Sequence, residues 1–565
     1  MKMSKMLGER TKTIPSEANA KGYANLLRAG YLKQVANGIF SLLPPARLIA
    51  NKIENIIRDE MNKVDGQEVL FPVVMPKEMW EESGRYYTIG EEMARFKDRT
   101  GRDMLLGMTH EEAAVHMARN IVTSYNQMPF MIYQIQTKFR DEPRSRGGLI
   151  RVREFTMKDA YSFHNSQEEL DAYYDRVHQA YMNIYKRIGL KNYISVASDT
   201  GMMGGSGAHE FMFLNEIGED TLVLCDHCGY KANMEVATCK RDIVNIKSEN
   251  LEEIFTGNAK SIEEVCSLLN IKPENTCKAV CYGNKADEKQ LIVVFLRGDL
   301  EVNEAKLKKV VKCDIYPANL EEFKFIKAGN IGPIGLENVT IILDESLENE
   351  QSLVCGANKE EYHIKGLNCK RDIANAIFHD VSKVKENSLC SVCGKPLRIS
   401  KGVEIGNIFK LGTKYTKSMN MLVHDNNGKS FNPIMGCYGI GIGRSLACVA
   451  EECSDEKGLV WPVSIAPWHI YLCPLKYAQD EVVKTQTDKL YEELSNAGIE
   501  VILDDRNVSP GYKFADSELI GVPFRVVVSA RTLENESVEF VCRATGEKQD
   551  VKISELKNHI LSLIK

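Results

Sequence analysis

Arginine side chains suited to phosphate chemistry gather in the run 138–155, KFRDEPRSRGGLIRVREF. Arg140 ends one predicted strand, and after a loop rich in proline and glycine a second predicted strand carries Arg151 and Phe155. Guanidinium groups stay charged and form forked hydrogen bonds with phosphate, and an aromatic face can stack on a nucleobase. The hairpin therefore predicts a nucleotide-phosphate site, with a solvated basic hairpin that contacts RNA or nothing as the alternative.

A glycine-rich run at 432–447, NPIMGCYGIGIGRSLA, carries a second arginine, Arg444. It lacks the surrounding strand-turn-helix unit of a dinucleotide site, and a glycine pattern by itself is weak evidence for one. An apolar strand that enters a helix fits the run better, because glycine lets the backbone approach a ligand closely. We predict that Arg140 and Arg444, far apart in the sequence, meet in one ATP site.

Two cysteine pairs follow the pattern Cys-x-x-Cys-Gly: Cys225 with Cys228, and Cys390 with Cys393. Four thiolates are a ligand set for tetrahedral structural zinc, which we predict here; a redox pair and four free thiols are the alternatives. The wide separation of the pairs fits a segment that leaves and re-enters a domain at one point. We expect no disulfide framework among the 16 cysteines of the chain.

The elements that must position these residues begin with a predicted helix at 44–64, where apolar residues recur every three or four positions. A predicted strand at 68–75 ends at Pro76, and a strand-like stretch at 125–138 leads into the arginine hairpin. A second long helix is predicted at 167–188 from the same apolar spacing.

The character of the chain changes near residue 225. The segment 225–401 is interpreted as an inserted domain with its own elements, predicted at 290–296, 303–311 and 339–343. After residue 466, strand and helix patterns alternate, which predicts a small α/β domain at 467–565.

Length and composition fit a multidomain globular protein. The 565 residues allow about three to five domains, and 44% hydrophobic with 27% charged residues is an ordinary balance. No apolar run reaches the length of a membrane helix, and the polar N-terminus lacks a signal-peptide pattern. We therefore expect a cytoplasmic protein without a membrane partner. The formal net charge of -6 leaves nucleic-acid binding to a local basic patch.

The two arginine-bearing runs resemble motifs 2 and 3 of the class II aminoacyl-tRNA synthetases, and 44–76 resembles motif 1, the dimer-forming element of that class. Further runs resemble the bacterial-type prolyl-tRNA synthetases: MTHEE at 108–112, EFTMKDAYSFH at 154–164, GGSGAHEF at 204–211, GNIFKLGTKYT at 406–416 and DDRNVSPGYKFADSELIGVP at 504–523. The resemblance covers nearly the whole chain.

The resemblance implies an α+β multidomain fold. An antiparallel-sheet catalytic domain would occupy 1–224 and 402–466, an α+β editing domain would be inserted at 225–401, and an α/β anticodon-binding domain would follow at 467–565. It also implies a homodimer that uses ATP and Mg²⁺ to form prolyl-adenylate and then charges proline tRNA. Such chemistry depends on positioning and charge neutralisation rather than on a protein nucleophile.

Matching to the family's motifs assigns the nucleotide contacts. Arg140 is expected to bridge the α-phosphate and the proline carboxylate, and Arg151 and Arg444 to hold the β- and γ-phosphates. Glu142 is expected to accept from the adenine amine, and Phe155 to stack on the base. Arg140 and Arg444 are thus the predicted catalytic residues.

The same matching assigns the proline pocket. Thr109 and Glu111 are expected to bind the cationic ring nitrogen, which needs an anionic partner; the alternative is that Thr109 merely caps a helix opening at His110. The remaining assignments are Met157, Asp159 and Gly406 as pocket walls, and Glu404 in the ATP and Mg²⁺ neighbourhood.

The insertion resembles a domain that hydrolyses alanine mischarged onto proline tRNA. Alanine is smaller than proline, and a missing methylene is worth only ~1–3 kcal/mol in discrimination, so a second sieve is needed. The match assigns this site to Lys278, the loop from Gly329 to Pro333, and His363. In the C-terminal domain, Arg506 and Lys513 are the expected anticodon contacts, with a solvated, internally salt-bridged loop as the alternative.

Two other identities compete with this interpretation. A class II synthetase for another amino acid, such as threonine, would be expected to carry zinc ligands in its catalytic pocket, and the sequence offers no such set there. A catalytically inactive relative that only binds tRNA would have lost Arg140, Glu142 or Arg444, and all three are present.

Overall fold

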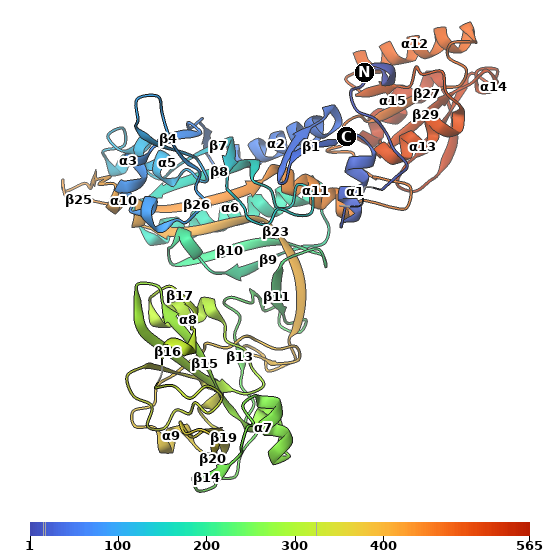
Figure 1. Ribbon diagram of the computed structural model, residues 1–565. Coiled ribbons are helices and arrows are strands. Elements are labelled where there is room, and N and C mark those ends of the chain that lie inside the picture. Colours follow the sequence, from blue (N-terminus) through green and yellow to red (C-terminus); the bar gives the residue numbers. More distant parts are fainter. Residues whose placement is uncertain (15, 17, 324, 565) are drawn as a thin grey trace. The chain divides into compact units, whose positions relative to one another are not determined.

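The computed structural model describes residues 1–14, 16, 18–323 and 325–564, and these form two compact units (Figure 1). The first unit consists of Met1–Ile194, Thr200–Ile217 and Val403–Lys565, and the second of Ser195–Asp199 and Gly218–Gly402. The segment 225–401 lies within the second unit. Within the described residues, none of the helices combines the length and apolar character needed to cross a bilayer.

An extended sheet forms the centre of the first unit, with neighbouring strands in the order β23-β26-β8-β7-β3. All of these pairs are antiparallel except that of β3 with β7. The strands are β3 (Gly66–Glu68), β7 (Phe130–Phe139), β8 (Glu154–His164), β23 (Arg398–Gly412) and β26 (Ile434–Gly441). The strand predicted at 125–138 is confirmed from Phe130 onward, because a 3₁₀ turn, Tyr125–Gln127, precedes it.

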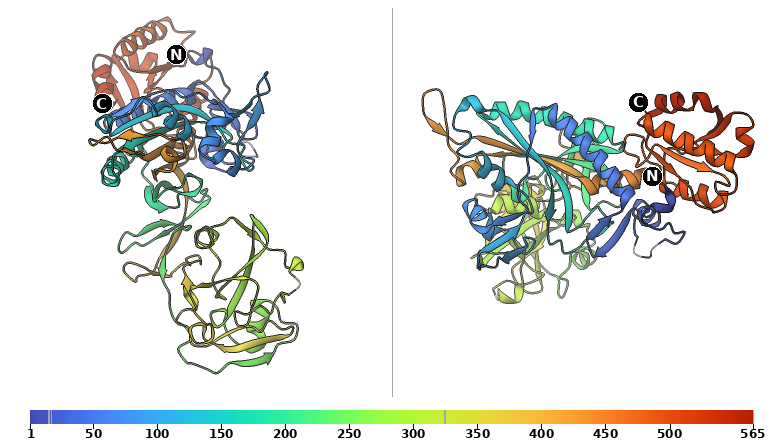
Figure 2. Two further views of the ribbon diagram at one scale, coloured as in Figure 1. Left: turned by 90° about the vertical axis from the view of Figure 1, so that its left-hand side faces the viewer. Right: turned by 90° about the horizontal axis from the view of Figure 1, so that it is seen from above.

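Three helices cover one face of this sheet (Figures 1 and 2): α2 (Pro44–Asn62), α6 (Gln167–Arg187) and α11 (Ile442–Glu452). They bury apolar residues at helical spacing, such as Ile49 and Ile53 in α2 and Val177 and Tyr181 in α6. The two long helices predicted from that spacing are confirmed.

The other face of the sheet carries a second apolar core, over which lies a small sheet of order β4-β6-β5. Its elements are β4 (Val74–Pro76), β5 (Arg95–Lys97), β6 (Asp103–Leu106), α3 (Lys77–Glu82), α4 (Arg85–Thr88), α5 (Glu111–Ala118) and α10 (Lys414–Ser418). The single strand predicted at 68–75 is wrong, because the chain leaves the central sheet after Glu68 and joins the small sheet at Val74.

The side chains of strand β8 alternate between these two faces. Ala160 packs into the core under the helices, whereas Tyr161 and Phe163 pack into the opposite core. Since side chains alternate along a strand, Met157 and Asp159 share the face of Tyr161. The site residues on β8 therefore lie on the side away from α2 and α6.

The C-terminal part of the first unit has a five-stranded sheet of order β28-β27-β29-β30-β31. Its elements are β27 (Ile470–Pro474), β28 (Val501–Leu503), β29 (Phe524–Val528), β30 (Ser537–Cys542), β31 (Lys548–Lys552), α12 (Glu481–Asn496), α13 (Pro510–Ile520), α14 (Ala530–Leu533) and α15 (Ile553–Ile564). The predicted alternation is confirmed for the parallel strands β27 to β29. The antiparallel hairpin β30–β31 was not predicted, because β31 is almost entirely exposed and lacks an apolar pattern.

Two of the sheets in the second unit have the strand orders β17-β15-β16-β18-β21 and β14-β20-β19. Their strands are β14 (Glu252–Phe255), β15 (Cys277–Asn284), β16 (Asp287–Arg297), β17 (Ile315–Pro317), β18 (Thr340–Asp344), β19 (Leu353–Gly356), β20 (Tyr362–Leu367) and β21 (Phe378–His379). Helices α7 (Ile262–Leu269) and α8 (Glu304–Val311) accompany them. The elements predicted at 290–296, 303–311 and 339–343 correspond to β16, α8 and β18.

Candidate active site

Arg140 and Arg444 lie at one place in the first unit. Burial lowers the pKa of the Arg140 guanidinium, Glu404 opposes this shift and the charge of Arg444 adds to it, so the three side chains are electrostatic neighbours. Arg444, in the first turn of α11, donates from Nε to the backbone oxygen of Ile150 at 2.8 Å and from Nη1 to a carboxylate oxygen of Glu404 at 3.2 Å. The fold thus brings together two arginines that are remote in the sequence.

Arg140 also connects β7 to the loop before α5. Its Nε donates to the backbone oxygen of Met108 at 3.2 Å. Its guanidinium carbon lies 5.3 Å from the centre of the Phe155 ring, within the range of a cation–π interaction. Arg140 and Phe155 therefore form one continuous surface.

Arg151 donates to the Glu142 carboxylate at 2.6 Å. The residues predicted to contact phosphate and adenine thus bond to each other, and a nucleotide that uses both must replace this bond. Arg151 lies in the loop before β8, which begins only at Glu154. The predicted second strand therefore starts later than expected, because Gly147 and Gly148 adopt left-handed φ angles of 65° and 63° and turn the chain.

The carboxylate of Glu111 is fixed at the start of α5. Thr109 Oγ1 donates to its Oε2 at 2.7 Å, and Arg85 Nη1 donates to the same oxygen at 3.1 Å. His110 precedes the first residue of α5, and no side chain caps the helix there. The capping alternative for Thr109 is therefore wrong, and its hydroxyl serves the carboxylate instead.

Asp159 is fully engaged with protein groups. Its Oδ1 forms an ion pair with Lys138 Nζ at 2.7 Å, and its Oδ2 accepts from Gln134 at 3.0 Å and from the Tyr161 hydroxyl at 2.8 Å. Burial acts to raise the pKa of Asp159, but Lys138, His110 and Gln134 together outweigh it, and the pKa lies below its usual value. The carboxylate therefore stays ionised, and its bonds hold the surrounding side chains in place.

The two other predicted wall residues make close packing contacts. A Cβ at Gly439 of β26 would lie 3.6 Å from the sulfur of Met157, so Met157 lies against the backbone of the neighbouring strand. A Cβ at Gly406 would come within 2.2 Å of the Tyr185 hydroxyl on α6. Gly406 is therefore required for β23 to pack on α6 and offers the site only its backbone.

Sequence reasoning missed two buried cations of this site, Arg85 and Lys138, which are 3% and 0% exposed. The signal for Arg85 was the pair Glu111–Glu112 at the head of an apolar helix, since adjacent buried carboxylates need a cation. Lys138 carried no comparable signal, because a lysine near the end of a strand normally reaches solvent.

A cavity of about 260 Å³ in the second unit brings Lys278, Gly329 and His363 together. Pro333 is not among the residues that line it. His363 Nδ1 lies 2.7 Å from the Thr256 hydroxyl, and burial lowers the pKa of the imidazole. Burial likewise lowers the pKa of Lys278. Three of the four predicted residues thus share one pocket.

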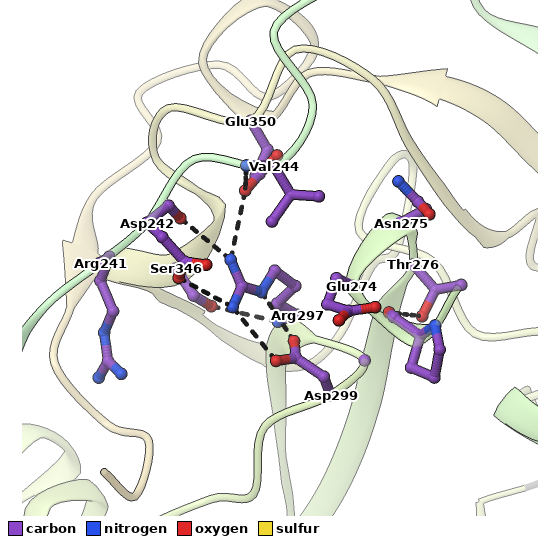
Figure 3. A network of polar contacts seen from close by, with 12 residues as sticks. Arg241, Asp242, Val244, Glu274, Asn275, Thr276, Arg297, Asp299, Ser346 and Glu350 are labelled. Atoms are coloured by element: carbon purple, nitrogen blue, oxygen red, sulfur yellow. Dashed lines mark hydrogen bonds and ion pairs between the residues drawn. The ribbon is translucent and has the colours of Figure 1, made fainter. Parts of the chain in front are cut away.

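The amine of Lys278 is held by a rigid turn, because it donates to the backbone oxygen of Gly298 at 3.1 Å. The preceding residue, Arg297, is buried in a polar network that Figure 3 shows from close by. Its guanidinium bonds to Asp299 at 2.7 Å and to Asp242 at 3.2 Å, and forms an ion pair with Glu350 at 3.5 Å. This network fixes the acceptor that orients Lys278.

The four cysteines of the two predicted pairs lie together in the second unit, with all four sulfurs within 4.8 Å of one another. Cys225 Sγ lies 3.5 Å from that of Cys393, and Cys228 Sγ lies 3.6 Å from that of Cys390. Tetrahedral zinc with Zn–S bonds of about 2.3 Å separates its sulfurs by slightly more than this. The backbone N–H of Cys228 lowers the pKa of Cys225 to about 7, whereas burial and the neighbouring thiols raise the pKa of Cys228 to about 12, so the fit to a metal rests on the spacing of the four sulfurs. The thiols therefore fit a structural zinc ion.

In the C-terminal sheet domain, Arg506 and Lys513 are both bonded internally. Lys513 is 2% exposed, and its amine donates to the backbone oxygens of Pro474 and Asp504 at 2.9 and 2.8 Å. Arg506 donates to Asp504 and Asp516, each at 2.8 Å. Lys513 does not offer its amine to solvent, so both side chains shape the loop after β28.

Two family models match consecutive parts of the chain. Residues 94–453 match the family described as tRNA synthetase class II core domain (G, H, P, S and T), and residues 465–563 match the anticodon binding domain family. The chain is 43% identical over 569 residues to the proline–tRNA ligase of Dehalococcoides mccartyi (strain CBDB1), covering 100% of this chain and 99% of that protein. It is 42% identical over 573 residues to the proline–tRNA ligase of Geobacillus sp. (strain WCH70), covering 100% of both.

Solved structures give a fold comparison. The prolyl-tRNA synthetase from Cryptosporidium parvum complexed with halofuginone and AMPPNP aligns with a TM-score of 0.59 at 16% identity, covering 99% of this chain and 79% of that one. The same protein complexed with L-proline and AMP aligns with a TM-score of 0.57 at 16% identity, covering 97% of this chain and 77% of that one. The predicted arrangement of a class II catalytic core followed by an anticodon-binding domain is confirmed.

Proposed function

The chain belongs to the class II aminoacyl-tRNA synthetases and, among them, to the proline–tRNA ligases, and we propose that Arg140 joins its two small substrates. Enzymes of this family form prolyl-adenylate and pyrophosphate from proline and ATP, and then pass the prolyl group to tRNA. Arg140 neutralises both the proline carboxylate and the α-phosphate. The observation that carries this proposal is its position among Glu111 on the proline side and Arg444 and Glu404 on the nucleotide side.

The remaining nucleotide contacts follow from the same geometry. Arg151 and Arg444 hold the β- and γ-phosphates as fixed cations, which lowers the cost of developing charge in phosphoryl transfer. Glu142 exchanges its bond with Arg151 for the adenine amine, and Phe155 stacks on the base. Mg²⁺ supplies further charge neutralisation when bound with ATP, and Glu404 is the carboxylate that would contact it.

Proline binds beside Arg140. Its ring ammonium is received by Glu111, whose Oε2 already accepts from Thr109 at 2.7 Å. Met157 and the backbone at Gly406 wall the ring, and Asp159 keeps its buried counter-ion Lys138 in place. The pocket then supplies one anion for the ammonium and one cation, Arg140, for the carboxylate.

Proline-dependent exchange of radiolabelled pyrophosphate into ATP tests this function. We expect exchange with proline and far less with threonine, glycine, serine, histidine or alanine at equal concentration. Exchange that requires another of these amino acids would contradict the substrate assignment, and exchange with none would leave only a tRNA-binding role.

The second unit is proposed to hydrolyse alanyl-tRNA. A pocket of about 260 Å³ suits a small aminoacyl ester. Lys278 supplies a cation for the 3′ end of the tRNA, Gly329 supplies backbone donors, and His363 orients the ester or the water. Pro333 shapes the loop without lining the pocket.

Zinc, dimerisation and RNA contact complete the proposal. Zinc bound by Cys225, Cys228, Cys390 and Cys393 would hold the two ends of the insertion together, because the cysteine pairs flank it in sequence. Residues 44–76, which include α2, form the contact of a cytoplasmic homodimer. In the C-terminal domain, Arg506 and Lys513 shape the loop that meets the anticodon.

A further inference from the structure

Two adjacent carboxylates are buried at the start of α5. Glu111 is 1% and Glu112 is 0% exposed, and neighbouring buried anions repel each other strongly at low dielectric. One guanidinium serves both: Arg85 Nη1 lies 3.1 Å from Glu111 Oε2 and 3.2 Å from Glu112 Oε1. Arg85 is therefore the cation that both carboxylates share; it acts to lower the pKa of Glu112, while burial keeps that pKa above its usual value.

The position of Arg85 is fixed on every side. Its guanidinium carbon lies 4.9 Å from the centre of the Trp80 ring and 5.4 Å from that of Tyr415. Its Nη2 lies 3.9 Å from the sulfur of Met203, in the loop before the predicted proline-pocket run at 204–211. A cation stacked between two aromatic rings cannot follow a mobile partner, so the carboxylates are held to it.

The charged groups near Arg85 leave one carboxylate available to a ligand. Lys138 and Asp159 cancel each other at 2.7 Å. Burial lowers the pKa of His110 to about 4, so its imidazole is neutral near pH 7. Arg85 cancels one of the two glutamates. Two further cations lie near the pair: Lys414, whose pKa burial lowers and whose amine donates to the backbone oxygen of Met203 at 3.1 Å, and Arg140, which is assigned to the proline carboxylate. Glu111, which Thr109 also contacts, is the carboxylate left for a ligand. A ring ammonium matches its negative charge.

We propose that Arg85 is a positioning residue of the proline site, which bonds to Glu112 and holds the carboxylate of Glu111 in place for the ring nitrogen. The inference rests on the proposed function, because it assumes that Glu111 receives proline. Without Arg85 the two adjacent buried carboxylates repel each other with no cation between them, and the carboxylate of Glu111 is no longer held in place. Without the charge of Glu112, Arg85 binds Glu111 alone and competes with proline.

The proposal predicts that two substitutions, each of which weakens proline binding by itself, compensate for each other in the double variant. Arg85→Met and Glu112→Gln are each expected to raise the KM for proline by about tenfold or more, the size of a lost charged hydrogen bond. The double variant restores one net negative charge and is expected to return to within about threefold of wild type, as a coupled pair does. The KM for ATP should stay within about twofold throughout, since neither residue faces the nucleotide.

The experiment is pyrophosphate exchange with the full-length enzyme, with KM for proline and ATP measured for wild type, both single variants and the double variant. Glu112→Gln is isosteric and the double variant keeps only the carboxylate of Glu111, without a second adjacent carboxylate to repel it, so both remain informative if Arg85→Met does not fold. Arg95→Met is the matched control, because exposed Arg95 donates only to backbone oxygens such as that of Ile89 at 2.7 Å. Inhibition by tetrahydrofuran-2-carboxylate, which lacks the ring ammonium, is measured alongside.

The measurements distinguish a role of Arg85 in placing charge from a role in packing alone. If Arg85 acts as proposed, the single variants lose proline affinity and keep their affinity for the analogue that lacks the ring ammonium. Equal weakening of both ligands, or a double variant no better than the singles, would overturn the inference. Glu111→Gln distinguishes a failure of the proposed function from a failure of this inference. An unchanged KM for proline in Glu111→Gln would contradict the proposed proline site itself. A raised KM for proline in Glu111→Gln, together with a normal KM in Arg85→Met, would overturn the inference alone.

Discussion

The amine of Lys138 lies 2.7 Å from a carboxylate oxygen of Asp159, and the two side chains are 0% and 6% exposed. They stand on the paired strands β7 and β8, next to the residues that are proposed to bind the substrates. A buried ion pair of this kind adds little net stability but is costly to break, because one unpaired charge is left in the interior.

Lys138→Met should therefore destabilise the first unit by about 3–5 kcal/mol, since Asp159 then lacks its counter-ion. Lys97→Met is the control, because Lys97 pairs with Asp103 at 2.9 Å on the surface, where such pairs contribute about 0–1 kcal/mol. Thermal unfolding of both variants checks this. Equal shifts of the midpoint would show that burial of the Lys138 pair has no energetic effect.

Stability should fall below about pH 6.5. Burial lowers the pKa of both His110 and His164 to about 4, so between that value and the normal 6.5 the unfolded chain binds protons that the folded chain does not. Each histidine then contributes a loss of about 1.4 kcal/mol per pH unit of acidification. His164→Gln should flatten the pH dependence of the unfolding midpoint, and an unchanged slope would contradict a neutral buried His164.

The elements with strong periodic patterns were predictable from sequence, and the pieces shaped by tertiary contact were not. Helices α2 and α6 bury apolar residues at helical spacing and were found where expected. The break between β3 and β4 was not predicted, because no local sequence pattern in residues 69–73 indicates that the chain leaves one sheet and joins another. The exposed strand β31 lacked a buried face that could have revealed it.

The site shows the same division. Motif residues such as Arg140 and Arg444 carry a recognisable chemical type and context. Arg85 and Lys138 act through burial, which depends on chain segments far away. The pair Glu111–Glu112 indicated that some buried cation is needed, but nothing in the sequence around Arg85 or Lys138 distinguished either from a surface cation. Lys513 shows the converse, since a lysine expected at the RNA surface is buried against backbone oxygens.

Elemental analysis should find one zinc per chain. Cys228→Ser and Cys393→Ser are each expected to lose the metal, because three thiolates leave the tetrahedral set incomplete. Cys239→Ser is the control. Cys239 lies opposite Cys390 in the backbone register of strands β13 (Cys239–Lys240) and β22 (Leu389–Cys390), but its sulfur is not part of the four-thiol cluster. Metal-free, folded wild-type protein prepared without chelator would contradict the zinc proposal.

Alanyl-tRNA should be deacylated by wild type and much more slowly by Lys278→Ala, because the fixed amine beside Gly298 would no longer bind the tRNA end. Lys285→Ala provides the control, since Lys285 lies at the exposed turn of the same β15–β16 hairpin. Hydrolysis of alanyl-tRNA charged on proline tRNA measures both. Equal rates for all three proteins would remove Lys278 from the site.

The central claim, that Arg140 joins proline to ATP, is tested most directly by pyrophosphate exchange with Arg140→Ala. Removing the one cation shared by the carboxylate and the α-phosphate should reduce proline-dependent exchange by at least about a thousandfold, roughly 4 kcal/mol of transition-state stabilisation. Unfolding should be unchanged, and the exposed neighbour variant Arg144→Ala should exchange normally. Near-normal exchange by folded Arg140→Ala would contradict the claim.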